Sequence, residues 1–300
     1  MSIHEKLFPS SLDLIPLADA ESIEEDTSTL FASSSFSSEN SGLGMLSSNT
    51  NLLHLTVHLP PPYGDRGLEI AQSPSGLREK GSTTGNAVWR VTPPLVEWVM
   101  ENEWFSSLLS SESTTVLELG AGVAGILPAV LAHRVKTYVA TDHSQQILKI
   151  LRRNIEENLV LLNATTSGKK KKASTEKADI MDRVIIDDLE WLHPPTAYLP
   201  SLSSMTKGTG FSIIFACDTI YNEALITPHV STLHHICSTR PADLPPTLVM
   251  VATELRSYEV HTEFLQEWTE SGFEVYRVSE DALSDNLKEG FAVYIGALRR

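Results

Sequence analysis

The chain has 300 residues with a formal net charge of −15, and 41% of its side chains are hydrophobic. This length and composition can bury one substantial core. The acidic balance argues against a nucleic-acid-binding surface and favours basic protein partners. Only two cysteines are present, too few for a disulfide framework or a cysteine metal site. Together with the lack of a signal peptide or a membrane-length apolar run, this predicts a cytoplasmic protein, with a nuclear location as the alternative.

The N-terminal part differs in composition from the rest. Residues 1–50 contain eight acidic residues and one basic residue, and ten serines fall between Glu21 and Thr50. Few of these side chains are suited to a core, so we predict a disordered, Ser-rich acidic tail over 1–50 and a folded domain over 51–300. A phosphorylated or partner-binding tail is the alternative.

The folded part begins with an extension. Residues 52–59 alternate between apolar and polar as a half-buried strand does, a run of three prolines ends this strand, and residues 68–72 suggest its partner. From residue 92 onward helices and strands alternate, apart from a lysine-rich loop insertion over 165–179 that contains Lys169–Lys172. The predicted helices are 92–103, 144–158, 223–237 and 258–271, and the predicted strands are 116–119, 136–141, 183–187, 211–217, 247–252, 273–278 and 291–298.

Strands alternating with helices predict an α/β fold with a mostly parallel, doubly wound sheet. The last two strands follow each other without a helix between them. They predict an antiparallel hairpin at the C-terminal edge of the sheet.

The stretch from Thr115 to Gly125 reads T-V-L-E-L-G-A-G-V-A-G. A buried strand is followed by a glycine-rich turn and then by apolar residues at helical spacing. This order places backbone N–H groups at a helix N-terminus, and the glycines let a ligand approach the main chain. A single G-x-G-x-x-G is a weak signal, since a tight strand-to-helix turn gives the same pattern.

Two acidic residues strengthen the prediction of a ligand site. Asp142 follows Gly120 by 22 residues, after a second apolar strand, and is placed to bind the hydroxyls of a ribose. The pattern therefore predicts a cofactor that contains a nucleoside. Glu118 favours S-adenosylmethionine over a nicotinamide dinucleotide, because a carboxylate attracts the amino group of the methionine part and repels a pyrophosphate.

These motifs resemble those of a known group of enzymes. Glu118-Leu-Gly-Ala-Gly122 with Asp142, Leu189-x-Trp191 and Asp218-x-x-Tyr221 are similar to the motifs of the seven-stranded S-adenosylmethionine-dependent protein lysine methyltransferases. The D-x-x-Y sequence is the specific part of the match. The sequences of residues 85–89 and 123–128 are most similar to those of the fungal ribosomal-protein lysine N-methyltransferases. The valosin-containing-protein lysine methyltransferase has the same motif set. The resemblance covers residues 52–300 and implies a Rossmann-like sheet of seven strands.

The resemblance also implies site residues. Asp142 would hold the ribose of S-adenosylmethionine, and Asp218 with Tyr221 would stand where the target lysine enters. The role of Glu254-x-Arg256, which resembles a Glu-x-Arg of related enzymes, stays open. The remaining residues implied for the cofactor are Trp89 as a cover, Glu118, Gly120, Ala121 and Gly122 around the methionine part, and Trp191 and Cys217 beside the adenine.

Methyl transfer requires a neutral amine, which is scarce because the pKa of lysine is about 10.4. We expect Asp218 to accept a hydrogen bond from this amine and Tyr221 to supply an aromatic wall. The alternative for Asp218 is to cap the helix that follows it.

We therefore expect a protein-lysine N-methyltransferase that acts on a ribosomal protein of the large subunit. Alternative targets are a chaperone, an AAA ATPase or an elongation factor. A nicotinamide-dependent oxidoreductase and a non-catalytic binding module are the rival classes. We further expect a monomer that binds neither membrane nor nucleic acid directly, and no metal site, since the histidines show no ligand spacing.

Overall fold

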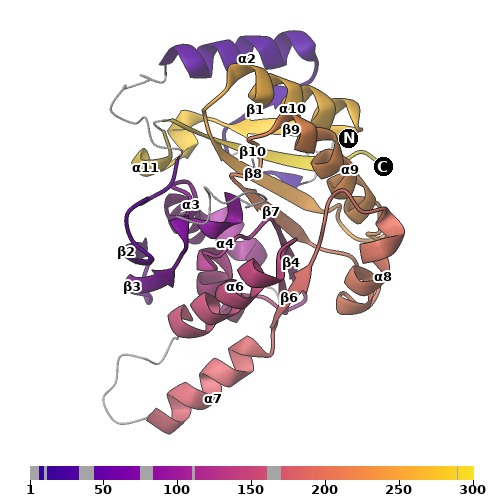
Figure 1. Ribbon diagram of the computed structural model, residues 1–300. Helices are drawn as coiled ribbons and strands as arrows, with labels where there is room; N and C mark the ends of the chain where they lie inside the picture. The colour runs from indigo at the N-terminus through magenta and orange to yellow at the C-terminus, as the bar shows by residue number, and fades with distance from the viewer. Residues whose placement is uncertain are drawn as a thin grey trace. The chain divides into compact units, whose positions relative to one another are not determined.

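The structure is a computed structural model that describes residues 7–9, 12–33, 44–74, 84–109, 112–160, 170–288 and 290–300, with side chains left out of the description for 170–174. The chain divides into two compact units, and each is described by itself. Unit 1 comprises Met1–Gly42 with Glu190–Arg300, and unit 2 comprises Leu43–Leu189. Figure 1 shows the helices and strands of both units and labels most of them.

Unit 2 contains three parallel strands in the order β4-β5-β6. Every residue of β4 is buried, including the polar Thr115 and Glu118 among its apolar neighbours. Because the strands are parallel, the carboxyl ends of β4 and β5 meet at one edge, with Leu119 opposite Thr141. The main elements of this unit are α3 (Thr92–Glu101), α4 (Glu103–Leu109), β4 (Thr115–Leu119), α5 (Ile126–Leu131), η4 (Ala132–Arg134), β5 (Thr137–Asp142), α6 (Gln145–Asn158), α7 (Lys170–Met181) and β6 (Val184–Asp188).

The predicted N-terminal β extension is present as a two-stranded antiparallel sheet. It consists of β2 (Leu52–Leu59) and β3 (Gly64–Ala71), and the short helix η3 (Thr84–Asn86) follows it. The hairpin packs against α3 through β2 and against α6 through β3. It is therefore an integral part of unit 2.

Unit 1 contains five strands in the order β1-β9-β10-β8-β7. The pair β7 and β8 is parallel, and the other neighbouring pairs are antiparallel. Both parallel strands end at the same edge, where Cys217 lies opposite Ala252. The elements are β1 (Leu14–Leu17), α2 (Ala20–Ser33), α8 (Pro195–Met205), β7 (Ile213–Cys217), α9 (Glu223–Ser238), β8 (Leu248–Glu254), α10 (Tyr258–Glu270), β9 (Phe273–Val278), η5 (Glu280–Ala282), α11 (Asp285–Lys288) and β10 (Phe291–Leu298).

The predicted fold class is confirmed, with one difference in the strand count. Apart from the hairpin, the described residues form eight strands, whereas seven were predicted. The additional strand is β1, which pairs antiparallel with β9. The antiparallel pair β9 and β10 is present as predicted, but β1 lies outside it, so the pair does not form the edge.

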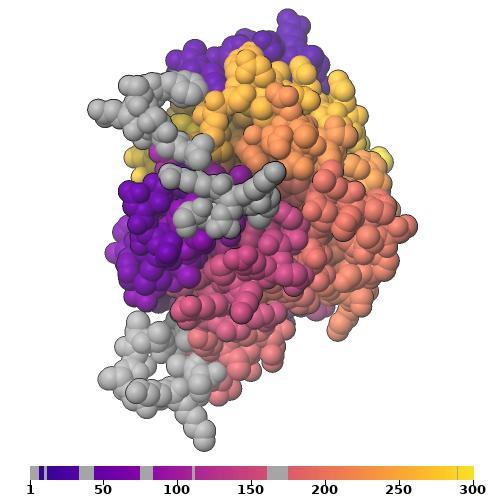
Figure 2. All heavy atoms as spheres, in the orientation of Figure 1, coloured from indigo at the N-terminus to yellow at the C-terminus, as the bar shows by residue number. Residues whose placement is uncertain are grey.

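The prediction of a disordered tail over 1–50 is wrong for the segment 14–33, which forms β1 and α2. Helix α2 packs along α10, as the ribbons in Figure 1 show, and in Figure 2 the indigo atoms of the N-terminal segment lie against the yellow-orange atoms of the C-terminal part. Its apolar face includes Ile23, which is fully buried, and Leu30. Asp26 lies on the same face and forms a buried ion pair with Arg277, at 2.7 Å from Oδ1 to Nε.

The lysine-rich insertion also differs from its prediction. A loop was predicted over 165–179, but residues 170–181 form helix α7. Residues 161–169, which include Lys169, lie outside the described part of the chain. The local sequence A-S-T-E-K-A-D-I-M has few helix breakers and so is compatible with a helix.

Removing residues 1–43 should lower the melting temperature by about 10 °C or more. Deletion exposes the apolar surface beneath α2 and removes Asp26, the partner of Arg277. Exposing one large apolar side chain costs about 1.5–3 kcal/mol, so the loss of several such contacts is enough for this shift. Differential scanning calorimetry of the full chain and of a chain that begins at residue 44 measures this. Equal melting temperatures would mean that α2 does not dock in solution.

Candidate active site

In unit 2 the turn after β4 is formed by glycines in the left-handed region. Gly122 has φ of 56°, and a Cβ there would lie 3.0 Å from the carbonyl oxygen of Gly85. A residue with a side chain would therefore be strained and would press on that backbone. The N–H of Ala121 donates to the carbonyl of Thr141 at 2.8 Å, which ties the turn to the end of β5.

Asp142, at the end of β5, holds the same turn with its carboxylate. Its Oδ2 accepts from the N–H of Gly122 at 3.0 Å, and its Oδ1 accepts from the N–H of His143 at 2.9 Å. Each carboxylate oxygen can accept more than one hydrogen bond. Asp142 can thus keep the turn in shape and still accept hydrogen bonds from the two hydroxyls of a ribose.

Glu118 lies in β4 and is buried. The pKa of its carboxyl is raised from the usual 4.5 to about 8, mainly by burial; a hydrogen bond from Tyr138 opposes the rise, and the charge of Asp142 adds to it. The Tyr138 hydroxyl donates to Oε2 at 2.9 Å. A cationic group placed beside this carboxyl would favour its ionised form.

The segment that contains Trp89 is joined to the glycine turn. The N–H of Val123 donates to the carbonyl of Gly85 at 2.8 Å, four residues before Trp89. Trp89 itself is half-buried and forms an antiparallel bridge with Met45. In unit 2 the structure therefore gathers the predicted turn residues and Asp142 at one strand edge and links the Trp89 segment to them.

In unit 1 the predicted residues Cys217 and Asp218 follow each other at the end of β7. Cys217 is buried. Asp218 adopts φ of 57°, an uncommon conformation for a residue with a side chain. Its N–H donates to the carbonyl of Ala252 at 2.8 Å, which holds this turn against β8.

The carboxylate of Asp218 is fully buried and pairs with Arg256. Nη1 of Arg256 donates to Oδ1 at 2.8 Å, and Nη2 donates to Oδ2. The N–H of Glu254 donates to Oδ1 at 3.2 Å, and the Glu254 carboxylate accepts from the same Arg256 at 3.0 Å. Burial raises the pKa of Asp218, and the hydrogen bonds and charge of Arg256 oppose this rise. One guanidinium thus lies between two carboxylates.

These contacts clarify two roles that the sequence left open. Asp218 does not cap α9, because Asn222 does so by accepting from the N–H of Ala224 at 3.1 Å. Arg256, whose role was open, is the partner of Asp218. The signal in the sequence was the position of Glu254-x-Arg256 after β8, since neighbouring parallel strands end at the same edge.

Tyr221 lies at a small cleft in unit 1. Its side chain is 41% exposed. The cleft is lined by Tyr221 together with Ile220, Thr253, Glu254, Arg256, Ser257, Val260 and His261. Asp218 lies behind Arg256 and does not line the cleft. An aromatic ring beside a carboxylate is a suitable entrance for a lysine side chain.

Trp191, the other predicted adenine neighbour, is half-buried and meets His229 edge-on, with ring centroids 4.8 Å apart. His229 is fully buried, which lowers its pKa to about 3, so its ring is neutral. Its Nε2 lies 3.3 Å from the hydroxyl of Thr219, the residue after Asp218. Sequence analysis did not identify His229.

The residues of unit 2 fit the chemistry of S-adenosylmethionine. Glu118 offers a carboxyl for the ammonium of the methionine part, Asp142 offers acceptors for the ribose, and Gly122 leaves room beside the backbone. When bound, this cofactor supplies a methyl group on a sulfonium. Within the described residues we find no cluster of three histidine, cysteine or acidic side chains that could hold a metal ion.

Replacing Glu118 with Gln should stabilise the protein more at pH 8 than at pH 5. The folded state holds a proton on Glu118 up to about pH 8, whereas the unfolded state loses it near 4.5. The free energy of unfolding therefore falls as pH rises between these values, and Glu118→Gln removes this dependence. Melting curves between pH 5 and pH 8 measure the difference. A difference that stays constant with pH would contradict the raised pKa.

Known proteins resemble this chain over most of its length. The ribosomal lysine N-methyltransferase 5 of Zygosaccharomyces rouxii is 32% identical over 66% of this chain and 69% of its own. The protein of that name from Candida glabrata is 29% identical over 73% and 74% of the two chains. A diaminohydroxyphosphoribosylamino-pyrimidine deaminase of Schizosaccharomyces pombe is 28% identical over 83% of this chain but 52% of its own length, so this chain spans about half of that relative.

Solved structures align with this chain at low identity. A putative S-adenosylmethionine-dependent methyltransferase from Streptococcus mutans aligns with a TM-score of 0.44 and 8% identity over 82% of this chain and 55% of its own. An O-methyltransferase from Bacillus cereus, solved with S-adenosylhomocysteine, aligns with a TM-score of 0.38 and 14% identity over 64% and 78% of the two chains.

A profile of the lysine methyltransferase family matches residues 75–271. This range contains the glycine turn, Asp142 and Asp218-x-x-Tyr221, and it covers well over half of the chain. The chain therefore belongs to the lysine methyltransferase family, as a protein-lysine methyltransferase that uses S-adenosylmethionine.

Proposed function

We propose that this enzyme methylates a lysine of a ribosomal protein of the large subunit. The observation that carries the proposal is the 32% identity to a relative named ribosomal lysine N-methyltransferase 5. The net charge of −15 supports it, because ribosomal proteins are basic and long-range attraction speeds encounter between opposite charges. Another protein target, such as a chaperone, an AAA ATPase or an elongation factor, is the second candidate.

On the cofactor side we assign the residues of unit 2 to the methionine part and the ribose. Glu118 pairs with the ammonium and is ionised when the cofactor is bound, while Gly120, Ala121 and Gly122 offer backbone and space. Asp142 accepts hydrogen bonds from the ribose hydroxyls. The hydrogen bond from Gly122 to Asp142 supports this assignment, because it fixes turn and acid before any cofactor arrives. The remaining assignments are Trp89 as a cover and Trp191 with Cys217 as neighbours of the adenine.

On the substrate side we assign the cleft at Tyr221 to the target lysine. The ring of Tyr221 packs against the aliphatic stem, and Glu254 gives the cleft an acidic wall. Asp218 acts through Arg256, since both of its oxygens accept hydrogen bonds from that guanidinium. In this assignment Asp218 is a positioning residue, and the direct hydrogen bond to the amine that the sequence predicted is not part of the proposal.

The carboxylates of Asp218 and Glu254 and the guanidinium of Arg256 together carry one net negative charge when all three groups are ionised. This charge attracts the protonated lysine to the cleft. The amine would have to lose its proton to solvent before methyl transfer, because only the neutral amine has a free lone pair. An ordinary carboxylate is too weak a base to remove that proton by itself. The work of the chain is therefore to position the amine and exclude water.

We also propose a cytoplasmic location and a monomeric enzyme. Cys217 and Cys237 are both buried and form no disulfide, which is typical of proteins from reducing compartments. In the part of the chain that the structure describes, we find no helix of the length and apolarity that a membrane span requires. Fluorescence microscopy of the tagged protein and light scattering test these two proposals.

Mass spectrometry of ribosomal proteins tests the target directly. Proteins from cells with and without this gene are compared, and one lysine should lose its methyl groups when the gene is absent. The purified enzyme with S-adenosylmethionine should restore the modification on ribosomes from the deleted strain. An unchanged ribosomal methylation pattern, with a lysine of another protein affected, would favour the second candidate.

The variants Asp218→Asn and Arg256→Gln should each lower kcat/KM for the protein substrate by about tenfold or more. If Asp218 acts through Arg256, the double variant should be no worse than the more damaged single variant, because both changes break the same contact. Steady-state kinetics of the four enzymes measures this cycle, and the affinity for S-adenosylhomocysteine should stay nearly constant. Additive losses in kcat/KM would instead indicate that Asp218 contacts the substrate amine directly.

A further inference from the structure

Asn154 joins two segments of unit 2 that are far apart in sequence. The residue lies on α6, and its side chain is fully buried. Its Oδ1 accepts from the N–H of Ala71 at 2.9 Å, and its Nδ2 donates to the carbonyl of Ala71 at 2.8 Å and to the carbonyl of Val123 at 2.6 Å. Both N–H groups of the amide and one lone pair of its oxygen are thus engaged.

The two ends of this bridge belong to different functional parts. Ala71 is the last residue of β3, so it belongs to the hairpin. Val123 follows Gly122 in the glycine turn, and its own N–H donates to Gly85. The hairpin precedes the segment that matches the family profile, which begins at residue 75. Asn154 therefore connects the cofactor turn with an element outside that match.

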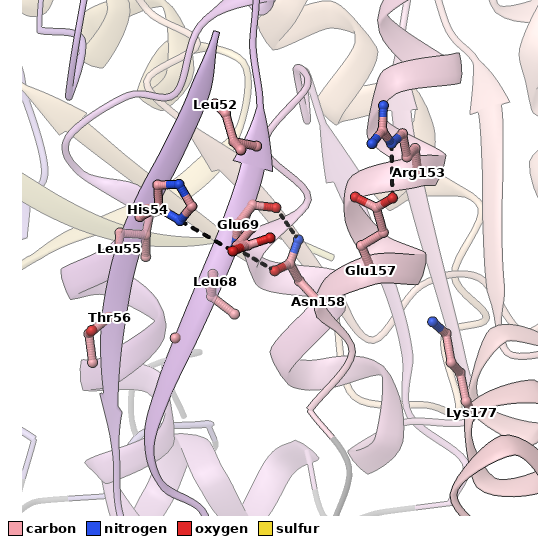
Figure 3. A pocket seen from close by; sticks show the side chains of 11 residues that line it. Leu52, His54, Leu55, Thr56, Leu68, Glu69, Arg153, Glu157, Asn158 and Lys177 are labelled. Atoms are coloured by element: carbon pink, nitrogen blue, oxygen red, sulfur yellow. Dashed lines mark hydrogen bonds and ion pairs between the residues drawn. The ribbon is translucent and has the colours of Figure 1, made fainter. Parts of the chain in front are cut away.

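Asn158 provides a matched comparison within the same helix. It lies one turn after Asn154 and makes the same pair of contacts to β3, accepting from the N–H of Glu69 at 2.8 Å and donating to its carbonyl at 2.8 Å. Figure 3 shows these two bonds beside the ion pair of Arg153 and Glu157. Its third bond goes to the carbonyl of Asn154 within the helix. Asn158 thus holds the hairpin without a bond to the glycine turn.

The hairpin has two further attachments. The N–H of His58 donates to the carboxylate of Glu97 in α3 at 2.7 Å. The hydroxyl of Tyr63 lies 3.0 Å from Nε2 of His133 in η4. Loss of one contact therefore leaves the hairpin attached. Asn154 differs from these contacts because it also binds the carbonyl of Val123. This bond is not needed to hold the hairpin in place.

We propose that Asn154 is a positioning residue that couples the order of the β2–β3 hairpin to cofactor binding. The proposal rests on the assignment of the glycine turn to the cofactor. A bound cofactor restricts the motion of the glycine turn. That turn restricts the motion of the Asn154 side chain through Val123, and Asn154 restricts the motion of the end of β3. Because such coupling is reciprocal, a firmly held hairpin also strengthens cofactor binding.

Hydrogen exchange of the unaltered protein tests the coupling without any substitution. S-adenosylhomocysteine should slow exchange of the amides in β3 severalfold, most of all at Ala71, whose N–H donates to Asn154. Mass spectrometry of peptides that cover 64–71 measures this. Unchanged exchange in these peptides at a saturating concentration would overturn the proposal.

The matched variants Asn154→Ala and Asn158→Ala separate coupling from attachment. Both lose two bonds to β3, so both should melt at lower temperature. Only Asn154→Ala should weaken S-adenosylhomocysteine binding, by about tenfold in calorimetry, and abolish the slowing of exchange in β3. Equal affinities in the two variants would overturn the proposal. If Asn154→Ala does not fold, the exchange result of the unaltered protein decides.

A third variant distinguishes this proposal from the one on which it rests. Asp142→Ala should weaken S-adenosylhomocysteine binding by about tenfold or more if the glycine turn is the cofactor site. Unchanged affinity in a folded Asp142→Ala protein would overturn the cofactor assignment and this inference with it. Weakened binding in Asp142→Ala combined with normal binding in Asn154→Ala would overturn only the coupling.

Discussion

The shape of the glycine turn depends on the hydrogen bond from the N–H of Gly122 to the carboxylate of Asp142. This bond exists because β4 and β5 are parallel neighbours, so that the turn after one strand meets the acid at the end of the other. Gly122 can direct its N–H toward the acid since it adopts a left-handed conformation. The turn and the acid are thus fixed before a ligand binds, which lowers the entropy cost of binding.

Each unit buries a carboxyl group at a strand of its sheet, and the two are stabilised differently. Glu118 has Tyr138 as a neutral partner, and burial raises its pKa to about 8. Asp218 has a cationic partner in Arg256, which opposes the effect of burial. A carboxyl without a cation is ready to receive one from a ligand, whereas a carboxylate that holds a guanidinium mainly determines where that guanidinium lies. This contrast supports a ligand-binding role for Glu118 and a positioning role for Asp218.

Much of the fold could be predicted from local sequence. The strands of the central sheet are short apolar runs, and their boundaries differ from the prediction by one or two residues, as for β7 (Ile213–Cys217) against 211–217. The glycine turn and the position of Asp142 followed from spacing, because strand, turn and helix occur in a fixed order. The segment 14–33 was missed, since its acidic and serine-rich composition outweighed a short apolar pattern at Ile23 and Leu30.

The partners of buried polar groups could not be predicted in the same way, because they lie far along the chain. Arg256 is 38 residues from Asp218, Ala71 is 83 residues from Asn154, and Arg277 is 251 residues from Asp26. The first pair can be inferred from topology, since parallel strands β7 and β8 end together. The other two require knowledge of which elements pack together.

A weaker signal was nevertheless present for both of these pairs. Asp26 occupies a position on the apolar face of α2, and Asn154 occupies one between Leu151 and Ile155 on the apolar face of α6. An unpaired polar group at such a position would be costly, so each must have a partner from another element. A polar residue within a helical apolar stripe therefore indicates a long-range contact even when its partner is unknown. Here the two contacts fix α2 and the hairpin, both of which lie before the segment matched by the family profile.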